Sequence, residues 1–188
     1  MTKPELRKQI LARRAALSGE ERRAKSAAVQ QRLLDLPEFQ AAGRVLFFVS
    51  FSSEVETLPM IEQALRLGKE VAAPKVMAGQ PELELRRLTD PQAQLQPGKL
   101  GILEPNDDCP LVSLAEADLI IVPAVAWDER GYRVGYGGGF YDRLLARAGD
   151  VPKIGLGFEC QVISEVPRLA HDLGVDILVT EERVLRFR

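Results

Sequence analysis

The stretch that decides the fold class is residues 43–74, which read GRVLFFVSFSSEVETLPMIEQALRLGKEVAAP. The apolar run at 45–49 lies between a glycine and a serine, and a short apolar run with such flanks is typical of a buried strand. Helical spacing over 59–67 then leads to a second short strand at 71–74. This order predicts a β-α-β unit, whose parallel strands need helices to cover the sheet.

The chain on either side continues the same pattern. Two N-terminal capping boxes predict helices over about 2–17 and 18–34. The remaining expected elements are a helix at 140–148, a loop with room for one short strand at 91–110, and strands at 83–88, 119–122, 154–158, 177–179 and 184–187. We therefore expect one α/β domain spanning 1–188, with a mostly parallel sheet flanked by helices. Ligands of such sheets bind beyond the carboxyl ends of the strands, which here are the loops after residues 49, 122 and 158.

Composition excludes several classes of protein. The chain has 188 residues and a formal net charge of −2, so it lacks the strongly basic surface that nucleic-acid binding needs. Its 2 cysteines have no metal-ligand spacing, and 1 histidine cannot form a multi-histidine metal centre. The longest apolar run, 119–127, is far shorter than the ~20 residues of a membrane span, and the N-terminus has no apolar signal-peptide region. We expect a cytoplasmic protein, a monomer, with no nucleic-acid or membrane partner.

The strongest local motif is residues 131–143, GYRVGYGGGFYDR. Four glycines within 135–139 precede an expected helix, and a backbone without Cβ atoms can turn tightly and approach a ligand closely. Successive N–H groups at a helix N-terminus bind anions. The motif lacks the GK[ST] of a Walker A loop and matches only the start of a G-x-G-x-x-G fingerprint. From these residues alone, a phosphate-binding loop and a flexible glycine-rich turn fit equally well.

The N-terminal helix carries two basic residues on one face. Lys3 and Arg7 are four residues apart, so their side chains could clamp a polyphosphate. The simpler interpretation is a solvated basic face, shared with Lys8, Arg13 and Arg14.

Two aspartates are candidate metal ligands. Asp142 lies in the first turn of the helix after the glycines, where it fits either a helix-dipole role, which the residues alone favour, or a Mg²⁺ ligand beside a phosphate. Asp172 could be a second carboxylate of that site only if the fold brings it near Asp142. The neighbouring His171 has the pattern of a lone surface histidine, without local support for a general-acid role.

Polar residues at 50–57 directly follow the first strand, a position that suits a binding site. Glu54 or Glu56 could accept paired N–H bonds from a guanidine-like edge of a heterocycle. Glu56 and Thr57 could equally cap the next helix, and for Thr57 we prefer capping.

Together these stretches resemble the 5-formyltetrahydrofolate cyclo-ligase family, also called 5,10-methenyltetrahydrofolate synthetases. The resemblance runs in order along nearly the whole chain, through KPELR (3–7), FVSFSSEVET (48–57), LIIVPAVAWDERGYRVGYGGGFYDRLL (119–145) and VPRLAHDLGVDILVTEE (166–182). The third stretch is the most specific. The resemblance implies a sugar-phosphate-isomerase/CoA-transferase-like α/β fold. It also implies ATP- and Mg²⁺-dependent closure of 5-formyltetrahydrofolate to 5,10-methenyltetrahydrofolate, with release of ADP and phosphate.

The resemblance further implies roles for individual positions. ATP binding falls on Lys3, Pro4, Glu5, Leu6, Arg7, Arg133, Val134, Gly135, Tyr136, Gly137, Gly138, Gly139, Phe140 and Tyr141. Folate binding falls on Val49, Glu54, Tyr136, Gly137, Gly138, Gly139 and Phe140. The implied catalytic residues are Arg133 and Tyr141, and the implied metal ligands are Asp142 and Asp172.

Two alternatives belong to other functional classes. A sugar-phosphate isomerase of the same fold would consume no ATP. A non-catalytic folate- or nucleotide-binding relative would be expected to lose some of the basic, glycine or acidic positions, all of which this sequence retains.

Overall fold

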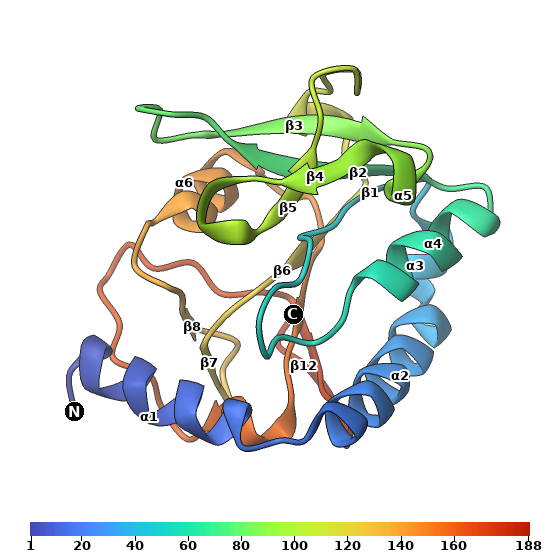
Figure 1. The fold of residues 1–188 in the computed structure, drawn as a ribbon. Coiled ribbons are helices and arrows are strands. Elements are labelled where there is room, and N and C mark those ends of the chain that lie inside the picture. Colours follow the sequence, from blue (N-terminus) through green and yellow to red (C-terminus); the bar gives the residue numbers. More distant parts are fainter.

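The computed structural model describes residues 1–188, with the exception of the Leu100 side chain. In this part of the chain the central sheet has seven strands in the order β12-β11-β9-β6-β1-β2-β3 (Figure 1). Their bounds are β1 (Arg44–Leu46), β2 (Glu70–Val76), β3 (Leu83–Leu88), β6 (Leu119–Val122), β9 (Lys153–Leu156), β11 (Ile177–Val179) and β12 (Val184–Arg186). The five inner strands, β11, β9, β6, β1 and β2, are parallel to one another. The edge strands β12 and β3 are antiparallel to the inner strands they pair with. The prediction of a mostly parallel α/β sheet is confirmed.

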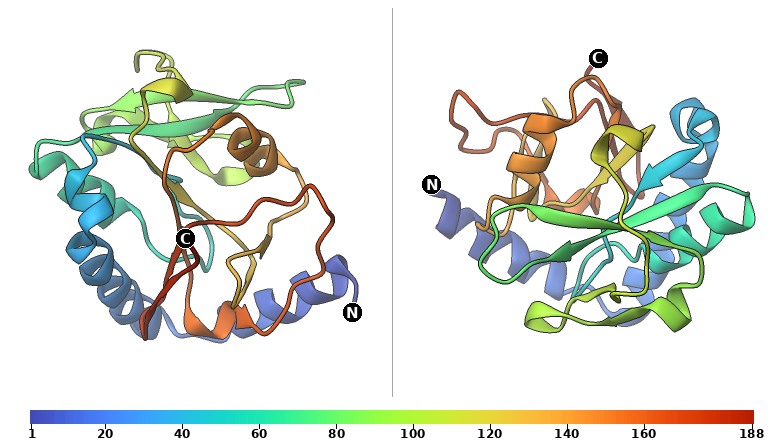
Figure 2. Two further views of the ribbon diagram at one scale, coloured as in Figure 1. Left: turned by 180° about the vertical axis from the view of Figure 1, so that it is seen from behind. Right: turned by 90° about the horizontal axis from the view of Figure 1, so that it is seen from above.

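Helices cover both faces of the sheet (Figures 1 and 2). The α-helices of the described chain are α1 (Lys3–Ala15), α2 (Gly19–Asp35), α3 (Pro37–Ala41), α4 (Leu58–Arg66), α5 (Pro91–Gln94) and α6 (Phe140–Arg147). Successive side chains of a strand point to opposite faces, and β6 shows the consequence. Leu119 and Ile121 join the core under α2, α3 and α4, whereas Ile120 and Val122 join the core under α6. A strand buried on both faces reads as a continuous apolar run, which is why 119–122 is predictable from sequence.

Both predicted capping boxes are present. The Thr2 N–H donates to Glu5 Oε2 at 2.7 Å, and the Glu5 N–H donates back to the Thr2 hydroxyl at 3.4 Å. Ser18 and Glu21 form the same reciprocal pair at the start of α2. These contacts span three residues, so the local sequence is enough to place both helix starts.

The expected strand at 45–49 is only partly correct. All five residues are buried, but pairing in β1 ends at Leu46. Beyond it, Thr57 Oγ1 donates to the Phe48 carbonyl at 2.7 Å and accepts from the Ser50 N–H at 2.9 Å. Thr57 is the N-cap residue of α4, as expected, but its side chain accepts no helix N–H, because its hydroxyl closes the loop after β1 instead.

A small second sheet was not expected from the sequence. It pairs β10 (Val162–Ile163), β7 (Ala126–Asp128) and β8 (Arg133–Val134), and it supports α1. Strands of two or three residues leave too short a pattern to recognise. The segment 91–110 likewise holds more than one short strand: besides α5 and the 3₁₀ helix η1 (Lys99–Gly101), it forms a hairpin of β4 (Leu95–Pro97) and β5 (Leu103–Pro105). The other 3₁₀ helices are η2 (Leu114–Glu116) and η3 (Glu159–Gln161).

Candidate active site

The chain order of the parallel strands reverses at β1. The next strand in the sequence, β2, pairs with one side of β1, and β6 pairs with the other side. Such a reversal separates the loops that leave the strands at the carboxyl edge of the sheet and creates room for a ligand. The loop after β9 joins this edge, since Gln161 Nε2 donates to the carbonyls of Ala124 and Val125 at 3.0 Å each.

The glycine-rich loop 135–139 connects β8 to α6 at this edge. Gly137 and Gly139 have φ values of 106° and 70°, in the left-handed region that side chains rarely adopt. A Cβ atom on Gly139 would also lie 2.9 Å from Arg143 Nη1. Gly139 is the N-cap of α6 and has no side chain that could cap the helix. The first N–H groups of α6, which point toward the loop, therefore have no side-chain cap. The local geometry favours a site for an anion.

The N-terminal helix brings Arg7 to this loop and Lys3 to the neighbouring 166–175 segment. Arg7 Nε donates to the Gly135 carbonyl at 2.6 Å. A Cβ atom on Gly137 would lie 3.5 Å from Arg7 Nη2, so the guanidinium runs beside the loop backbone. One turn earlier, Lys3 Nζ forms an ion pair with Asp172 at 2.9 Å. Arg7 thus contacts the glycine loop, and Lys3 contacts the 166–175 segment, rather than bulk solvent alone.

Arg133 connects the two candidate metal-ligand segments. Its Nη2 donates to Asp142 Oδ1 at 2.8 Å, and its Nη1 donates to the Leu173 carbonyl at 3.5 Å. The Arg133 side chain is buried, whereas that of Asp142 is 54% exposed. The fold therefore brings Asp142 and the segment that carries Asp172 to one guanidinium, although they are far apart in the sequence.

Asp172 is held by two donors. The Leu169 N–H donates to its carboxylate at 2.8 Å, and Lys3 donates at 2.9 Å. Partial burial acts to raise the pKa of Asp172, but these two donors outweigh it, so the pKa is lowered and the group is charged at neutral pH. Its neighbour His171 is exposed and lies 3.9 Å from Asp172, as expected for a surface histidine.

The loop after β1 supplies a buried carboxylate. Glu54 is 5% exposed; its Oε2 accepts the Phe51 N–H at 3.0 Å, and its Oε1 accepts the Tyr136 hydroxyl at 3.0 Å. Burial raises the pKa of Glu54, partly offset by the Phe51 N–H, the nearby charge of Arg14 and the Tyr136 hydroxyl. Burial and the charge of Glu54 also raise the pKa of Tyr136. The contact joins the loop after β1 to the glycine loop.

Comparison with known proteins identifies the family. The family model described as the 5-formyltetrahydrofolate cyclo-ligase family matches residues 1–181. This chain belongs to the 5-formyltetrahydrofolate cyclo-ligase family. It is 34% identical to the 5-formyltetrahydrofolate cyclo-ligase of Escherichia coli K12 over 178 residues, which cover 93% of this chain and 98% of the relative.

Solved structures agree with this membership. The solution structure of Aquifex aeolicus 5,10-methenyltetrahydrofolate synthetase is 41% identical, with a TM-score of 0.88, covering 100% of this chain and 94% of the other. The Mycoplasma pneumoniae 5,10-methenyltetrahydrofolate synthetase structure is 22% identical, with a TM-score of 0.78 over 96% and 99% of the two chains. The second similarity supports the fold alone. The resemblance noted from the sequence is confirmed.

Several positions of the cyclo-ligase pattern turn their side chains away from the glycine loop. Leu6 and Val134 are buried in the small core beneath α1, and Glu5 is occupied in the Thr2 capping box. Pro4 lies in the first turn of α1. Leu6 and Val134 can therefore offer a ligand only their backbone atoms. Phe140, in contrast, has its ring 5.2 Å from the Arg143 guanidinium, at the end of the loop.

Tyr141 is oriented inward from the first turn of α6. Its hydroxyl is buried and has no hydrogen-bond partner among the described residues. Burial, together with the charge of Glu54, raises the pKa of Tyr141, so the phenol is neutral. Val49, the remaining implied folate contact, is buried where the chain leaves β1.

Arg14 and Ser53 are site residues that the sequence analysis missed. The expectation that Arg14 shares a solvated face with Lys8 and Arg13 is wrong: Arg14 is 1% exposed, and it bonds Ser53 and Tyr136. A signal was available, because Leu6, Ile10 and Arg14 are four residues apart and lie on one buried helix face.

The described residues contain no group of three or more His, Cys, Asp or Glu side chains placed to hold a metal ion. Nor does the part of the chain that the structure describes include a helix long and apolar enough to cross a membrane.

Proposed function

We propose that this chain catalyses the ATP- and Mg²⁺-dependent closure of 5-formyltetrahydrofolate to 5,10-methenyltetrahydrofolate, releasing ADP and phosphate. The observation that supports this most is the meeting of three groups at one sheet edge in a cyclo-ligase family member. These are the glycine loop, the basic side chains of Lys3, Arg7 and Arg133, and the buried carboxylate of Glu54.

The reaction needs activation of a poor leaving group. An amide-type formyl oxygen does not leave readily, so the γ-phosphoryl group of ATP is transferred to it and ADP departs. The folate N10 then attacks the formyl carbon, the C–O bond breaks, and phosphate leaves. Phosphoryl transfer asks a protein chiefly for positioning and charge stabilisation. The loop N–H groups with Lys3, Arg7 and Arg133 suit that task.

The folate side of the site is assigned to Val49, Glu54, Tyr136 and Phe140, with the backbone of Gly137–Gly139. A buried carboxylate with two oxygens can accept paired N–H bonds from the guanidine-like edge of a pterin. Glu54 is such a group, and two protein donors already orient it. Tyr141 and Arg133 are assigned to contact the reacting groups, because the Tyr141 hydroxyl and the Arg133 Nε are buried without a hydrogen-bond partner among the described residues.

Asp142 and Asp172 are the proposed metal ligands. Mg²⁺ prefers oxygen donors and uses one or two carboxylates together with water and phosphate oxygens, so two acids are enough. The donor set fits, because both are carboxylates and their segments meet at Arg133. A bound Mg²⁺ would offset the charge that develops on the transferred phosphoryl group.

Three coarser features complete the proposal. We assign residues 1–188 to a single cyclo-ligase domain of the sugar-phosphate-isomerase/CoA-transferase-like type. We assign the enzyme to the cytoplasm, supported by two free cysteines, which suit a reducing compartment. We expect it to act as a monomer without nucleic-acid or membrane partners.

The test is incubation of the purified chain with 5-formyltetrahydrofolate, ATP and Mg²⁺, followed by the absorbance of the methenyl product. Appearance of that absorbance together with ADP is expected. Folate binding without ADP formation would indicate a non-catalytic relative, and failure to bind folate with turnover of a sugar phosphate would indicate an isomerase.

Glu54→Gln refines this test. Loss of a charged hydrogen-bond acceptor costs about 1.5–3 kcal/mol, so the KM for the folate should rise about 10-fold or more. The KM for ATP should change little, because Glu54 lies on the folate side. An unchanged folate KM in a folded variant contradicts the assignment of Glu54.

A further inference from the structure

The buried guanidinium of Arg14 is bonded to hydroxyl groups rather than directly to a carboxylate. Nε donates to Ser53 Oγ at 2.9 Å, and Nη2 donates to the Tyr136 hydroxyl at 2.7 Å. Nη1 has no partner among the described residues. A buried charge without a direct counter-ion lowers stability, and here it lies between the two loops of the proposed site.

The bond to Tyr136 has a directional consequence. A guanidinium can only donate, so the Tyr136 oxygen accepts from Arg14 and must send its own single proton elsewhere. That proton faces Glu54 Oε1, 3.0 Å away. Arg14 therefore fixes the direction of both hydrogen bonds: Arg14 donates to Tyr136, and Tyr136 donates to Glu54. The Tyr136 ring also lies over the guanidinium at 5.8 Å.

The bond to Ser53 acts on the loop that carries the same carboxylate. Ser53 adjoins Glu54 in a loop where Ser52 has a φ of 54°, an uncommon conformation for a residue with a side chain. Holding the Ser53 hydroxyl keeps this loop in place. The positive charge of Arg14 also opposes the effect of burial on Glu54 and so favours its ionised form.

The glycine loop does not depend on Arg14 for its backbone position. Arg7 holds the Gly135 carbonyl at 2.6 Å, and Arg143 Nη2 holds the Gly138 carbonyl at 2.8 Å. Loss of Arg14 would therefore be felt first at Tyr136 and Glu54.

We propose that Arg14 is a positioning residue for folate binding, acting through Tyr136 and Ser53 to hold Glu54 as an oriented hydrogen-bond acceptor. This inference rests on the proposed function and deepens it, because it names a residue that touches neither substrate. Its expected signature is a selective effect on the folate.

The experiment compares Arg14→Met with Arg13→Met, which removes an exposed guanidinium from the neighbouring position of α1. The dissociation constant of 5-formyltetrahydrofolate is measured by calorimetry without ATP, and KM values are measured for both substrates. Arg14→Met should weaken folate binding about 10-fold or more, as for a lost charged hydrogen bond, and change the KM for ATP less than about 2-fold. Arg13→Met should match the wild type.

A double-mutant cycle with Tyr136→Phe tests the route. If Arg14 acts through Tyr136, the double variant should lose at least about 3-fold less folate affinity than the product of the two single losses. If the losses of folate affinity in the two single variants multiply in the double variant, or if both KM values change equally, the inference is overturned in favour of a structural role.

Two further arms keep the outcomes separate. Should Arg14→Met fail to fold, Arg14→Lys takes its place; a lysine keeps the charge but reaches one hydroxyl at a time, so a smaller folate-selective loss is expected. A wild-type chain that neither binds nor cyclises the folate refutes the proposed function. A wild type that does both, with Arg14 variants that do so equally well, refutes the inference alone.

Discussion

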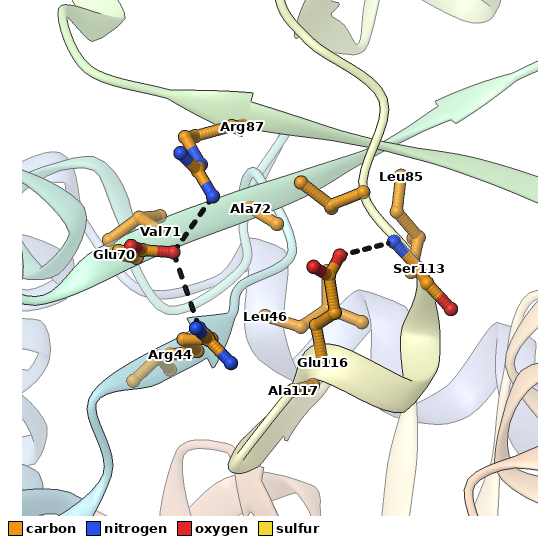
Figure 3. Close-up of a pocket in the computed structure, with 12 residues that line it drawn as sticks. Arg44, Leu46, Glu70, Val71, Ala72, Leu85, Arg87, Ser113, Glu116 and Ala117 are labelled. Carbon is orange, nitrogen blue, oxygen red and sulfur yellow. Dashed lines mark hydrogen bonds and ion pairs between the residues drawn. The ribbon is translucent and has the colours of Figure 1, made fainter.

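The two edges of the central sheet carry their charges differently. At the amino edge, a pocket lies between the starts of β1 and β2, and Glu70 is shared there by Arg44 at 3.4 Å and Arg87 at 2.9 Å (Figure 3). These side chains are 53%, 46% and 39% exposed for Arg44, Glu70 and Arg87, and water screens them.

The carboxyl edge holds three charged side chains in the interior, those of Arg14, Glu54 and Arg133. Three buried side-chain atoms lack a hydrogen-bond partner among the described residues, namely Arg14 Nη1, Arg133 Nε and the Tyr141 hydroxyl, and all three belong to the candidate site. Buried polar groups without partners are rare because they lower stability. Buried polar groups without partners, rather than the pocket, thus distinguish the edge to which we assign the proposed site.

The largest expected difference between the edges concerns the backbone of the glycine loop. Gly137→Val places a branched side chain at a φ of 106° beside Arg7 and should reduce kcat/KM for ATP about 100-fold or more, since small displacements at a reacting centre are costly. Gly149→Val is the control. It imposes comparable strain at a φ of 56° with nothing within 4 Å, and it should lose about 1–3 kcal/mol of stability but keep its activity. Equal loss of activity in both variants would mean that strain, not the loop, matters.

The next effect concerns Asp142. Asp142→Asn should raise the Mg²⁺ concentration for half-maximal rate about 10-fold, as is typical when a group near a metal is altered. Asp150→Asn, at an exposed position just beyond the C-terminal end of α6, is the matched control and should follow the wild-type titration. Superimposable curves for Asp142→Asn and wild type would leave Asp142 with a helix-dipole role.

A smaller effect should appear in the pH dependence of stability. The folded-state pKa of Glu54 is raised above 4.5, so the folded protein holds this proton more tightly than the unfolded chain does. Its stabilising contribution is complete below pH 4.5 and is lost as the pH rises through the raised pKa. Denaturant unfolding across this window should therefore show a steeper decline for wild type than for Glu54→Gln. Glu56→Gln, from the same loop, should keep the wild-type slope; parallel curves for wild type and Glu54→Gln would exclude a raised pKa.

The smallest effect is expected at the amino edge. Glu70→Gln removes the partner of both Arg44 and Arg87, yet exposed ion pairs contribute about 0–1 kcal/mol, so unfolding should change by less than about 1 kcal/mol. Both KM values and kcat should match the wild type. A clear kinetic defect in Glu70→Gln would show that the two edges are coupled and would weaken the contrast between them.

Local sequence determined much of this protein. The capping boxes of α1 and α2 join residues three apart, and the strands at 83–88, 119–122 and 177–179 follow from short apolar or alternating runs. The glycine loop before α6 was likewise evident, because its φ values depend on the residues themselves. Family membership followed from the same stretches.

Only the tertiary structure decided how the charges of the site are used. Arg14 contacts Ser53 and Tyr136, which are 39 and 122 residues away in the sequence, and Lys3 pairs with Asp172 at a separation of 169 residues. A local pattern cannot distinguish a solvated arginine from one buried against distant hydroxyls, because the difference is the arrival of a partner from another part of the chain. Helices and turns follow from interactions between near neighbours, whereas the burial and direction of each charge depend on which segments the folded sheet brings together.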